Sequence, residues 1–300
     1  MTTPAATHGL PPAEHAVDAA LARALLAQQH PDLADLPIAH AASGWDNVMF
    51  RLGDELALRL PRRAAGAALI ATEQRWLPDL ARELPLPVPA PLRTGSAGLG
   101  YPWPWSVTPW LPGVPAEQAP LRADQAARLG QFLKALHRPA PDDAPFNPYR
   151  SVPLAGRATT EPTMARVAAA RPGLIDAAVG EAWRAGLAAE IDLAPTWIHG
   201  DLHARNVLSH DGAVSGIIDW GDMARGDPAT DLYGLWMLLP DAAARAAALK
   251  AYGGVSAATL ARARGWAVAM GVVLVEAGSK DDPGLAAMGE RTLWALREGP

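Results

Sequence analysis

An Asp-Gly pair set between two short apolar segments constrains this chain more than any other feature of its sequence. Residues 207–208 and 214–218 have the composition of β-strands, and Asp211–Gly212 between them is a strong two-residue turn. The segment is therefore predicted to form a β-hairpin. Asn206 stands just before the first arm and Asp219 just after the second. The hairpin brings both side chains to its open end, where amide and carboxylate oxygens suit Mg²⁺.

A third polar residue, Asp201, lies five residues before Asn206, in a loop that follows a short strand at residues 197–198. It can face the same point, where a carboxylate would orient and deprotonate an attacking hydroxyl. Together the three residues predict a phosphoryl-transfer site with a base and two magnesium ligands. His199 and His203 flank Asp201 and offer a rival interpretation as zinc ligands, which leaves the hairpin pair unexplained. We expect the two histidines to brace the loop through hydrogen bonds.

Three short apolar segments near the N-terminus, residues 38–41, 48–52 and 56–60, are separated by turn-forming residues. Strands joined by tight turns predict an antiparallel meander. Ser43 and Gly44 belong to the first turn, which is neither a Walker A loop nor a G-x-G-x-x-G loop. This turn is either a plain hairpin turn or, because of its place between the first two strands, a loop that covers phosphates.

The third of these strands and the helix predicted after it place opposite charges near each other. Ala57 and Arg59 share one face of the strand, and its leucines face the other way. Glu73 lies inside the apolar stripe of the helix, where a carboxylate is costly unless a cation meets it. Arg59 is the natural partner, and beside the small Ala57 it could lie over a flat ring and near phosphates. Two plainer alternatives remain, an exposed arginine and a glutamate that reaches water at the edge of the stripe.

The stretch of residues 85–113 is rich in proline and tryptophan and is predicted to connect two lobes in an extended conformation. Such a connector exposes backbone groups that the edge of a purine could use. Pro109 has no N–H and could only accept through its carbonyl, whereas the amide of Leu111 could donate. The tryptophans could instead simply pack the lobes.

The rest of the chain is predicted to be mostly helical, so the fold class is α+β. We divide it into an N-terminal lobe of residues 1–107, a hinge of residues 108–113 and a C-terminal lobe of residues 114–300. Helical periodicity covers residues 12–29, 121–138, 165–190 with a break near 171–173, 231–238, 242–252, 257–275 and 283–297. His137 is expected to cap helical carbonyls, and Asp227 and Asp231 to act as scaffold residues that fix the loop after the hairpin.

Composition excludes several classes of protein. The 300 residues contain no cysteine, which excludes disulfides, thiolate metal sites and a cysteine nucleophile. A formal net charge of −5 argues against a nucleic-acid or anionic-membrane partner. The N-terminus lacks the apolar core of a signal peptide, and the longest apolar run, residues 266–275, is shorter than the ~20 residues of a membrane span. We therefore expect a cytoplasmic protein with no nucleic-acid and no membrane partner.

Several motifs in chain order resemble those of the aminoglycoside phosphotransferase family, which includes macrolide and related small-molecule kinases. The resemblance covers about residues 36–240 and is carried by Gly44-Trp45-Asp46-Asn47, Leu58-Arg59-Leu60-Pro61, His199-Gly200-Asp201-x-x-x-x-Asn206, Ile218-Asp219-Trp220-Gly221 and Gly226-Asp227-Pro228-Ala229-x-Asp231. It implies a protein-kinase-like bilobal fold, with a small antiparallel-sheet N-lobe and a mostly helical C-lobe. Arg59 stands where the family most often has lysine, which leaves the choice between ATP and GTP open.

The resemblance also implies a role for each candidate residue. Asp201 would be the catalytic base, and Asn206 and Asp219 would bind Mg²⁺. The nucleotide site would be formed by Ser43, Gly44, Ala57, Arg59, Glu73, Pro109 and Leu111. The implied reaction is transfer of the γ-phosphoryl group of ATP or GTP to a hydroxyl of a small molecule, which is an aminoglycoside, a macrolide or a metabolite. The alternative is a non-catalytic nucleotide-binding regulatory module.

Aminoglycosides are polycations, so their binding pockets should be acidic. The acidic candidates in the C-terminal helices, Glu276, Asp281 and Asp282, are few. The sequence therefore leaves the phosphate acceptor open.

Overall fold

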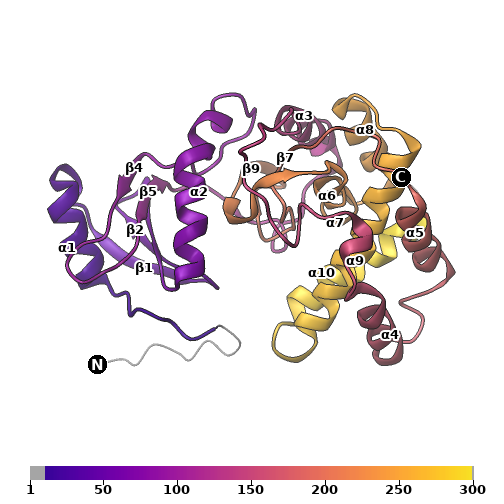
Figure 1. The fold of residues 1–300 in the computed structure, drawn as a ribbon, viewed down its shortest axis with the longest axis horizontal. Coiled ribbons are helices and arrows are strands. Elements are labelled where there is room, and N and C mark those ends of the chain that lie inside the picture. Colours follow the sequence, from indigo (N-terminus) through magenta and orange to yellow (C-terminus); the bar gives the residue numbers. More distant parts are fainter. Residues whose placement is uncertain (1–10, 299–300) are drawn as a thin grey trace. The chain divides into compact units, whose positions relative to one another are not determined.

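The computed structural model of the protein describes residues 11–298, which divide into two compact units (Figure 1). Among the described residues, one unit contains residues 11–82 together with Val88–Leu111, and the other contains Glu83–Pro87 and residues 112–298. The N-terminal residues on which the signal-peptide prediction depends lie outside the described residues.

The first unit is built on an antiparallel sheet of five strands in the order β1-β2-β3-β5-β4. Its strands are β1 (Ile38–Ser43), β2 (Asn47–Leu52), β3 (Leu56–Pro61), β4 (Arg93–Gly95) and β5 (Trp105–Pro109). The first three strands form the predicted meander, because each is joined to the next by a tight turn. The stretch that the sequence presented as a connector supplies the other two strands, and buried Trp105 and Val107 of β5 belong to the core of the sheet.

Two helices, α1 (Ala19–Gln29) and α2 (Ala64–Ala81), and the short 3₁₀ helix η1 (Pro31–Leu33) complete this unit. The prediction of a helix from residue 12 was wrong, because Asp18 caps α1 by accepting a hydrogen bond from the backbone N–H of Leu21. α1 packs against β1 and β4, and α2 packs against β3 and β5. Pro78 lies inside α2, which continues beyond it to Ala81.

The predicted hairpin is confirmed in the second unit. Its arms are β8 (Val207–His210) and β9 (Ala213–Ile217), and β6 (Val114–Pro115) pairs with β8 to give a three-stranded sheet. Asp211 and Gly212 have φ values of 50° and 75°, both in the left-handed region that the favoured two-residue hairpin turn requires. A separate pair of strands, β7 (Thr196–Ile198) and β10 (Ala224–Gly226), is antiparallel.

The rest of the second unit is helical. Its α-helices are α3 (Ala126–Leu136), α4 (Thr160–Ala170), α5 (Ala177–Ala188), α6 (Ala229–Leu232), α7 (Gly234–Leu238), α8 (Ala242–Tyr252), α9 (Ala257–Asp281) and α10 (Pro283–Ala295). Its 3₁₀ helices are η2 (Ala123–Gln125), η3 (Leu154–Gly156), η4 (Trp220–Asp222) and η5 (Leu296–Glu298). The predicted break near residue 172 separates α4 from α5, but α4 begins five residues earlier than the sequence indicated. The helix predicted over residues 231–238 is two short helices.

Helix α9 organises the packing of this unit. It contacts α4, α5, α6 and α10, and 72% of its most apolar window is buried within the protein. By length and composition, its 25 residues could cross a membrane. The apolar run of residues 266–275, which was identified from the sequence, is by itself too short to do so. Close packing explains the composition, since a Cβ at Gly278 would lie 2.3 Å from the backbone nitrogen of Ala286 in α10. We therefore interpret α9 as a core helix.

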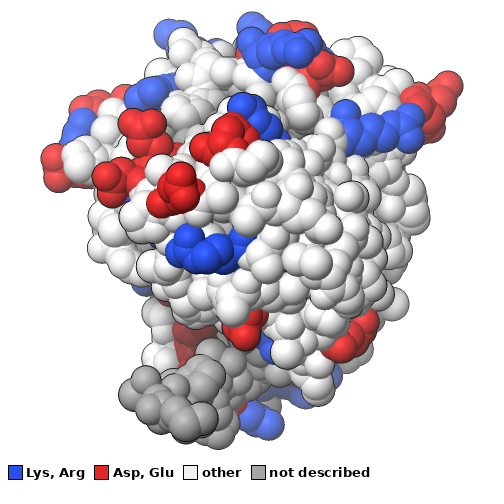
Figure 2. Space-filling model, turned by 90° about the vertical axis from the view of Figure 1, so that its left-hand side faces the viewer, with Lys and Arg blue, Asp and Glu red and all other residues white. Residues whose placement is uncertain are grey.

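On the face of the molecule drawn in Figure 2, acidic and basic side chains are interspersed, and no continuous basic patch covers it. A basic patch is the usual electrostatic mark of a nucleic-acid-binding surface. This face offers no such surface.

Candidate active site

The loop between β7 and β8 is held by one buried carboxylate. Asp231 of α6 is 0% exposed and accepts hydrogen bonds from the backbone N–H groups of His199 at 2.6 Å and Gly200 at 2.8 Å. Gly200 has a φ of 85°, and a Cβ there would lie 2.6 Å from the carbonyl oxygen of Asp222. The loop can therefore follow this path only with glycine at that position. Asp231 has the scaffold role that the sequence predicted.

His137 caps α3 through its backbone N–H, as predicted, while its ring has a role that the sequence did not indicate. Its Nε2 lies 3.2 Å from Oδ2 of Asp231 and its Nδ1 lies 3.0 Å from the hydroxyl of Tyr252. The ring therefore supports the buried carboxylate, and only the backbone N–H of His137 bonds a helical carbonyl, that of Leu133. Tyr252 comes from α8, 115 residues along the chain, so local sequence did not indicate this contact.

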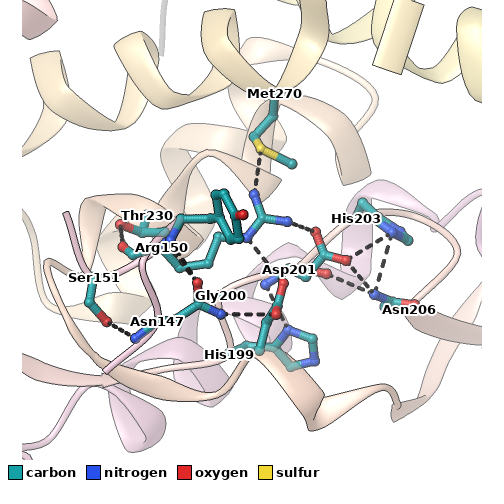
Figure 3. Close-up of polar contacts among 12 residues, drawn as sticks. Asn147, Arg150, Ser151, His199, Gly200, Asp201, His203, Asn206, Thr230 and Met270 are labelled. Carbon is teal, nitrogen blue, oxygen red and sulfur yellow. Dashed lines mark hydrogen bonds and ion pairs between the residues drawn. The ribbon is translucent and has the colours of Figure 1, made fainter. Parts of the chain in front are cut away.

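Asp201 lies in this loop with a side chain that is 22% exposed and has neighbours at both oxygens (Figure 3). Its Oδ1 accepts a hydrogen bond of 2.7 Å from Nη2 of Arg150. Its Oδ2 lies 3.3 Å from Nε2 of His203 and 3.4 Å from Nδ2 of Asn206. Burial by itself raises the pKa of Asp201, but the nearby charges and hydrogen bonds of His203 and Arg150 hold that pKa well below its ordinary value. Asp201 is therefore a carboxylate at neutral pH.

Asn206 is fixed by the same loop. Its Nδ2 donates a hydrogen bond of 2.9 Å to the backbone carbonyl of Asp201, and the residue is 5% exposed. With the nitrogen used in this way, the amide oxygen accepts no hydrogen bond from the described part of the chain. A neutral oxygen that is oriented but unused can serve as a ligand for a hard cation.

The hairpin ladder continues for one step beyond β9, where Ile218 pairs with Asn206, and Asp219 is the residue that follows this pair. The N–H of Ile218 donates to the carbonyl of Asn206 at 2.8 Å, and the chain then turns at Asp219, which has a φ of 61°. This left-handed conformation is strained in a residue with a Cβ and is often found at functional sites. The Asp219 carboxylate is exposed and forms no hydrogen bond or ion pair with the described residues. The donor set of Asn206 and Asp219, two hard oxygens, fits Mg²⁺.

The two histidines brace the loop, as predicted, and their ring nitrogens leave no room for the zinc interpretation. Nδ1 of His199 accepts from the N–H of Asp201 at 3.2 Å, so Nε2 carries the proton and donates to the carbonyl of Ile218 at 3.0 Å. Nδ1 of His203 accepts from the N–H of Arg205 at 3.2 Å, and its Nε2 faces Asp201. All four nitrogens are thus engaged within the protein.

Sequence reasoning missed Arg150. Its guanidinium contacts Asp201 and also donates through Nε to Oδ2 of Asp222 at 3.2 Å, and its side chain is only 13% exposed. It lies in a proline-rich loop with no periodic pattern, and its two carboxylate partners are 51 and 72 residues away. The proline-rich loop of residues 139–159 contains two arginines, Arg150 and Arg157, and no local signal distinguishes one from the other.

In the first unit, Arg59 and Glu73 form the predicted ion pair. Nη2 of Arg59 lies 3.1 Å from Oε1 of Glu73, and Nη1 contacts the other carboxylate oxygen. The two residues are 6% and 1% exposed. Both plainer alternatives, an exposed arginine and a glutamate that reaches water, are therefore wrong. A planar guanidinium held on both arms by one carboxylate keeps a fixed orientation.

The other candidates of this unit lie at two places. Gly44 closes the turn after β1, with its N–H donating to the carbonyl of Asn47 at 2.8 Å, and Ser43 bonds His40 at 3.0 Å through its hydroxyl. Ala57, Pro109 and Leu111 lie at one end of the β3–β5 pair, where Ala57 is 1% exposed and Pro109 is opposite Leu56.

At that end of the sheet the amide of Trp110 is already used, since it donates to the carbonyl of Glu55 at 2.7 Å. Leu111 is the next residue, and its amide has no backbone acceptor in the described part of the chain. An available donor thus lies close to the carbonyl of Pro109.

The fold, an antiparallel-sheet unit with a mostly helical second unit, is that of a kinase-like phosphotransferase. The chain belongs to the phosphotransferase enzyme family, whose sequence model matches residues 37–266. No curated protein matches the sequence.

Solved structures of similar fold include aminoglycoside and macrolide phosphotransferases. The complex of APH(2″)-IIIa with GDP and kanamycin is 20% identical, with a TM-score of 0.62 over 91% of this chain and 97% of that one. Macrolide 2′-phosphotransferase MphH from Brachybacterium faecium is 24% identical, with a TM-score of 0.57 over 93% of this chain and 97% of that one. ADP-bound APH(2″)-Ib is 19% identical, with a TM-score of 0.56 over 93% and 98% of the two chains. At these identities the likeness establishes the fold.

Proposed function

We propose that the protein transfers the γ-phosphoryl group of ATP or GTP to a hydroxyl of a small molecule, with Asp201 as base and Asn206 and Asp219 as magnesium ligands. One observation carries the proposal. The Asn206 amide is bonded through its nitrogen to the Asp201 backbone, and its oxygen accepts no hydrogen bond from the described residues. Asp219, whose carboxylate has no hydrogen bond or ion pair among those residues, follows Ile218, which pairs with Asn206. A base, a neutral oxygen and a free carboxylate thus belong to one local structure.

Each residue has a separable role in this reaction. Asp201 accepts the hydrogen bond of the acceptor hydroxyl, aims its oxygen at the phosphorus and receives its proton as the new bond forms. Asn206 and Asp219 would hold Mg²⁺, which, when bound, neutralises charge on the β- and γ-phosphates. Catalysis of this kind depends mainly on holding the reacting groups in position and on neutralising their charge. The hydrogen bonds that fix the loop of Asp201 agree with this requirement.

On the nucleotide side, Arg59 would donate to phosphate oxygens while Glu73 holds its guanidinium. The amide of Leu111 and the carbonyl of Pro109 would meet the edge of the purine. Structures of similar fold were solved with GDP, with ADP and with ATP, so both purines stay in the proposal. The cytoplasm supplies both nucleotides and suits a chain without cysteine.

The two arginine pairs in the C-terminal region favour a macrolide or a metabolite alcohol over a polycationic aminoglycoside. Glu276 lies against Arg166 with an Oε2 to Nη2 distance of 3.0 Å, and Asp282 lies against Arg205 at 2.6 Å. Each carboxylate is therefore neutralised by a neighbour. A polycation would have to compete with these pairs for the acidic groups.

The test is a screen of phosphate transfer from labelled ATP and GTP to a panel of macrolides, aminoglycosides and metabolite alcohols. The expected result is a phosphorylated product with at least one alcohol. Loss of product in Asp201→Asn by about 10²-fold or more, with nucleotide binding retained, would support the base assignment. Asp211→Asn is a matched control, because that residue lies at the exposed hairpin turn. Nucleotide binding without transfer to any acceptor would favour the regulatory-module alternative.

A second experiment tests the nucleotide side. Arg59→Lys keeps the positive charge but replaces a two-armed contact with Glu73 by a single point of contact. We expect the KM for the nucleotide to rise several-fold in this variant, while the affinity for the acceptor stays unchanged. A variant with unchanged KM values for both ATP and GTP would remove Arg59 from the proposed phosphate site.

A further inference from the structure

Among residues 11–298, Arg150 is the one side chain that contacts the proposed base by a short, charge-assisted hydrogen bond, and the reaction described above gives it no role. We propose that Arg150 is a positioning residue, which holds Asp201 in one orientation and leaves its second carboxylate oxygen for the acceptor hydroxyl. The inference rests on the proposed function of Asp201. Figure 3 shows the guanidinium between Asp201 and the thioether of Met270.

The two oxygens of Asp201 differ in how firmly they are held. Oδ1 accepts from Nη2 of Arg150 at 2.7 Å, which is the length of a strong hydrogen bond between charged groups. Oδ2 has only long contacts, 3.3 Å to His203 and 3.4 Å to Asn206. A further donor can therefore reach Oδ2 at lower cost than Oδ1, and an acceptor hydroxyl is such a donor.

The guanidinium is itself fixed at a second carboxylate. Nε of Arg150 donates to Oδ2 of Asp222 at 3.2 Å, and Nδ2 of Asn147 donates to Oδ1 of Asp222 at 2.9 Å. Nη1 reaches the sulfur of Met270 in α9 at 3.1 Å. Arg150 thus bridges Asp201 and Asp222 with two arms of one rigid plane, which a lysine cannot do.

The backbone of Arg150 is fixed as well. Its N–H donates to the side-chain oxygen of Asn147 at 3.1 Å, and its carbonyl accepts from the hydroxyl of Thr230 at 3.3 Å. Thr230 lies in the same short helix as Asp231, the carboxylate that holds the catalytic loop. Helix α6 therefore holds both Arg150 and the catalytic loop. This favours an Arg150 that keeps its position over one that blocks the site and moves away when the acceptor binds.

The bridge also sets where the base stands relative to the proposed metal ligands. Asp222 belongs to η4, three residues after Asp219. Asn206 is already bonded to the backbone of Asp201. Arg150 supplies the second connection, because it links the side chain of Asp201 to the segment that carries Asp219. Loss of one bridge should let the carboxylate rotate while the loop keeps its path.

The test compares Arg150→Gln and Arg150→Lys with Arg157→Gln. Arg157 is a matched control on the same loop, since it donates to the carbonyl of Tyr149 at 3.0 Å and lies over the ring of Trp266 without touching the base. We expect kcat to fall about 10–100-fold in Arg150→Gln and less in Arg150→Lys, with the nucleotide KM changed by no more than about twofold, because a misplaced reacting group costs rate more than affinity. Arg157→Gln should keep its kcat.

Chemical rescue separates positioning from a general structural effect. Guanidinium ion at low millimolar concentration, far below denaturing levels, should restore kcat of Arg150→Ala by about tenfold but not that of Asp201→Asn. A wild-type kcat in Arg150→Gln would overturn the proposal. So would an equal loss in Arg157→Gln, since the effect would then come from the loop as a whole.

Crystal structures of Arg150→Gln and Arg157→Gln test the same proposal without a measurement of enzyme activity. The Asp201 carboxylate should rotate or occupy several orientations in the first variant and keep its orientation in the second. An unchanged carboxylate in Arg150→Gln overturns the positioning role. Absence of wild-type transfer to every acceptor would instead refute the proposed function, and the crystallographic comparison would still decide whether Arg150 orients Asp201.

Discussion

Asp231→Asn should destabilise the second unit by about 2.5–4 kcal/mol, although the substitution hardly changes the shape of the side chain. The carboxylate accepts from the N–H groups of His199 at 2.6 Å and Gly200 at 2.8 Å, and it is 0% exposed. An amide can accept only one of these bonds, and its NH₂ group then faces the other N–H. Losing a bond to a charged acceptor costs about 1.5–3 kcal/mol, and weakening the remaining bond adds roughly 1 kcal/mol.

The measurement is urea unfolding followed by tryptophan fluorescence, with each transition fitted separately because the protein has two units. We expect a lower midpoint with an unchanged slope. Heating should show a decrease in Tm of roughly 10 °C, at about 2–4 °C for each kcal/mol. Asp241→Asn is the matched control, because Asp241 caps α8 by accepting from Ala244 at 2.8 Å and asparagine caps as well as aspartate. A midpoint for Asp231→Asn within about 0.5 kcal/mol of the wild type would refute this account of the loop.

Two further predictions concern backbone conformation and pH. Gly200→Ala should destabilise the protein by more than about 3 kcal/mol, because the left-handed φ and the 2.6 Å approach of a Cβ to the Asp222 carbonyl oxygen act together. Gly254→Ala is the control, because Gly254 has a φ of 80° but a Cβ there would have no atom within 4 Å. Thermal unfolding should show a destabilisation of only about 1 kcal/mol for this control. Hydrogen bonds from Arg205 lower the pKa of Asp282 from 3.8 to about 2, so this group contributes stability that is present above pH 4 and is lost as the pH falls from 4 to 2. Asp282→Asn retains the cap of α10 and should lose that acid-dependent part of the unfolding curve; an unchanged pH profile would contradict the pairing.

Local patterns predicted the parts of the fold that depend on neighbours in sequence. The meander followed from three apolar segments separated by turns, and the hairpin followed from Asp211 and Gly212, whose backbone conformations its turn requires. The buried pair of Arg59 and Glu73 was also accessible, because the two residues are only 14 positions apart on consecutive elements. A carboxylate inside an apolar stripe needs a cation, and Arg59 lies on the adjacent strand.

The same reasoning failed where a contact closes a long stretch of chain. The beginning of α1 was predicted too early because periodicity extends beyond the capping Asp18. His137 caps α3 as predicted, but nothing indicated that its ring would bond Asp231, 94 residues away. Proline-rich residues 139–159 gave no periodic signal, so nothing indicated that one of their side chains would be buried against the proposed base.

The sequence alone determined the local chemistry of this protein. It specified which residues form the hairpin and the meander and which oxygens could serve a phosphoryl transfer, because strand and turn preferences depend on residues a few positions apart. Tertiary structure decided which charges meet. Arg150 reaches Asp201 across 51 residues and Asp222 across 72, and no spacing rule encodes a partner at that distance. Only the folded chain, which packs the loop against α6 and α9, decides which carboxylates face the guanidinium.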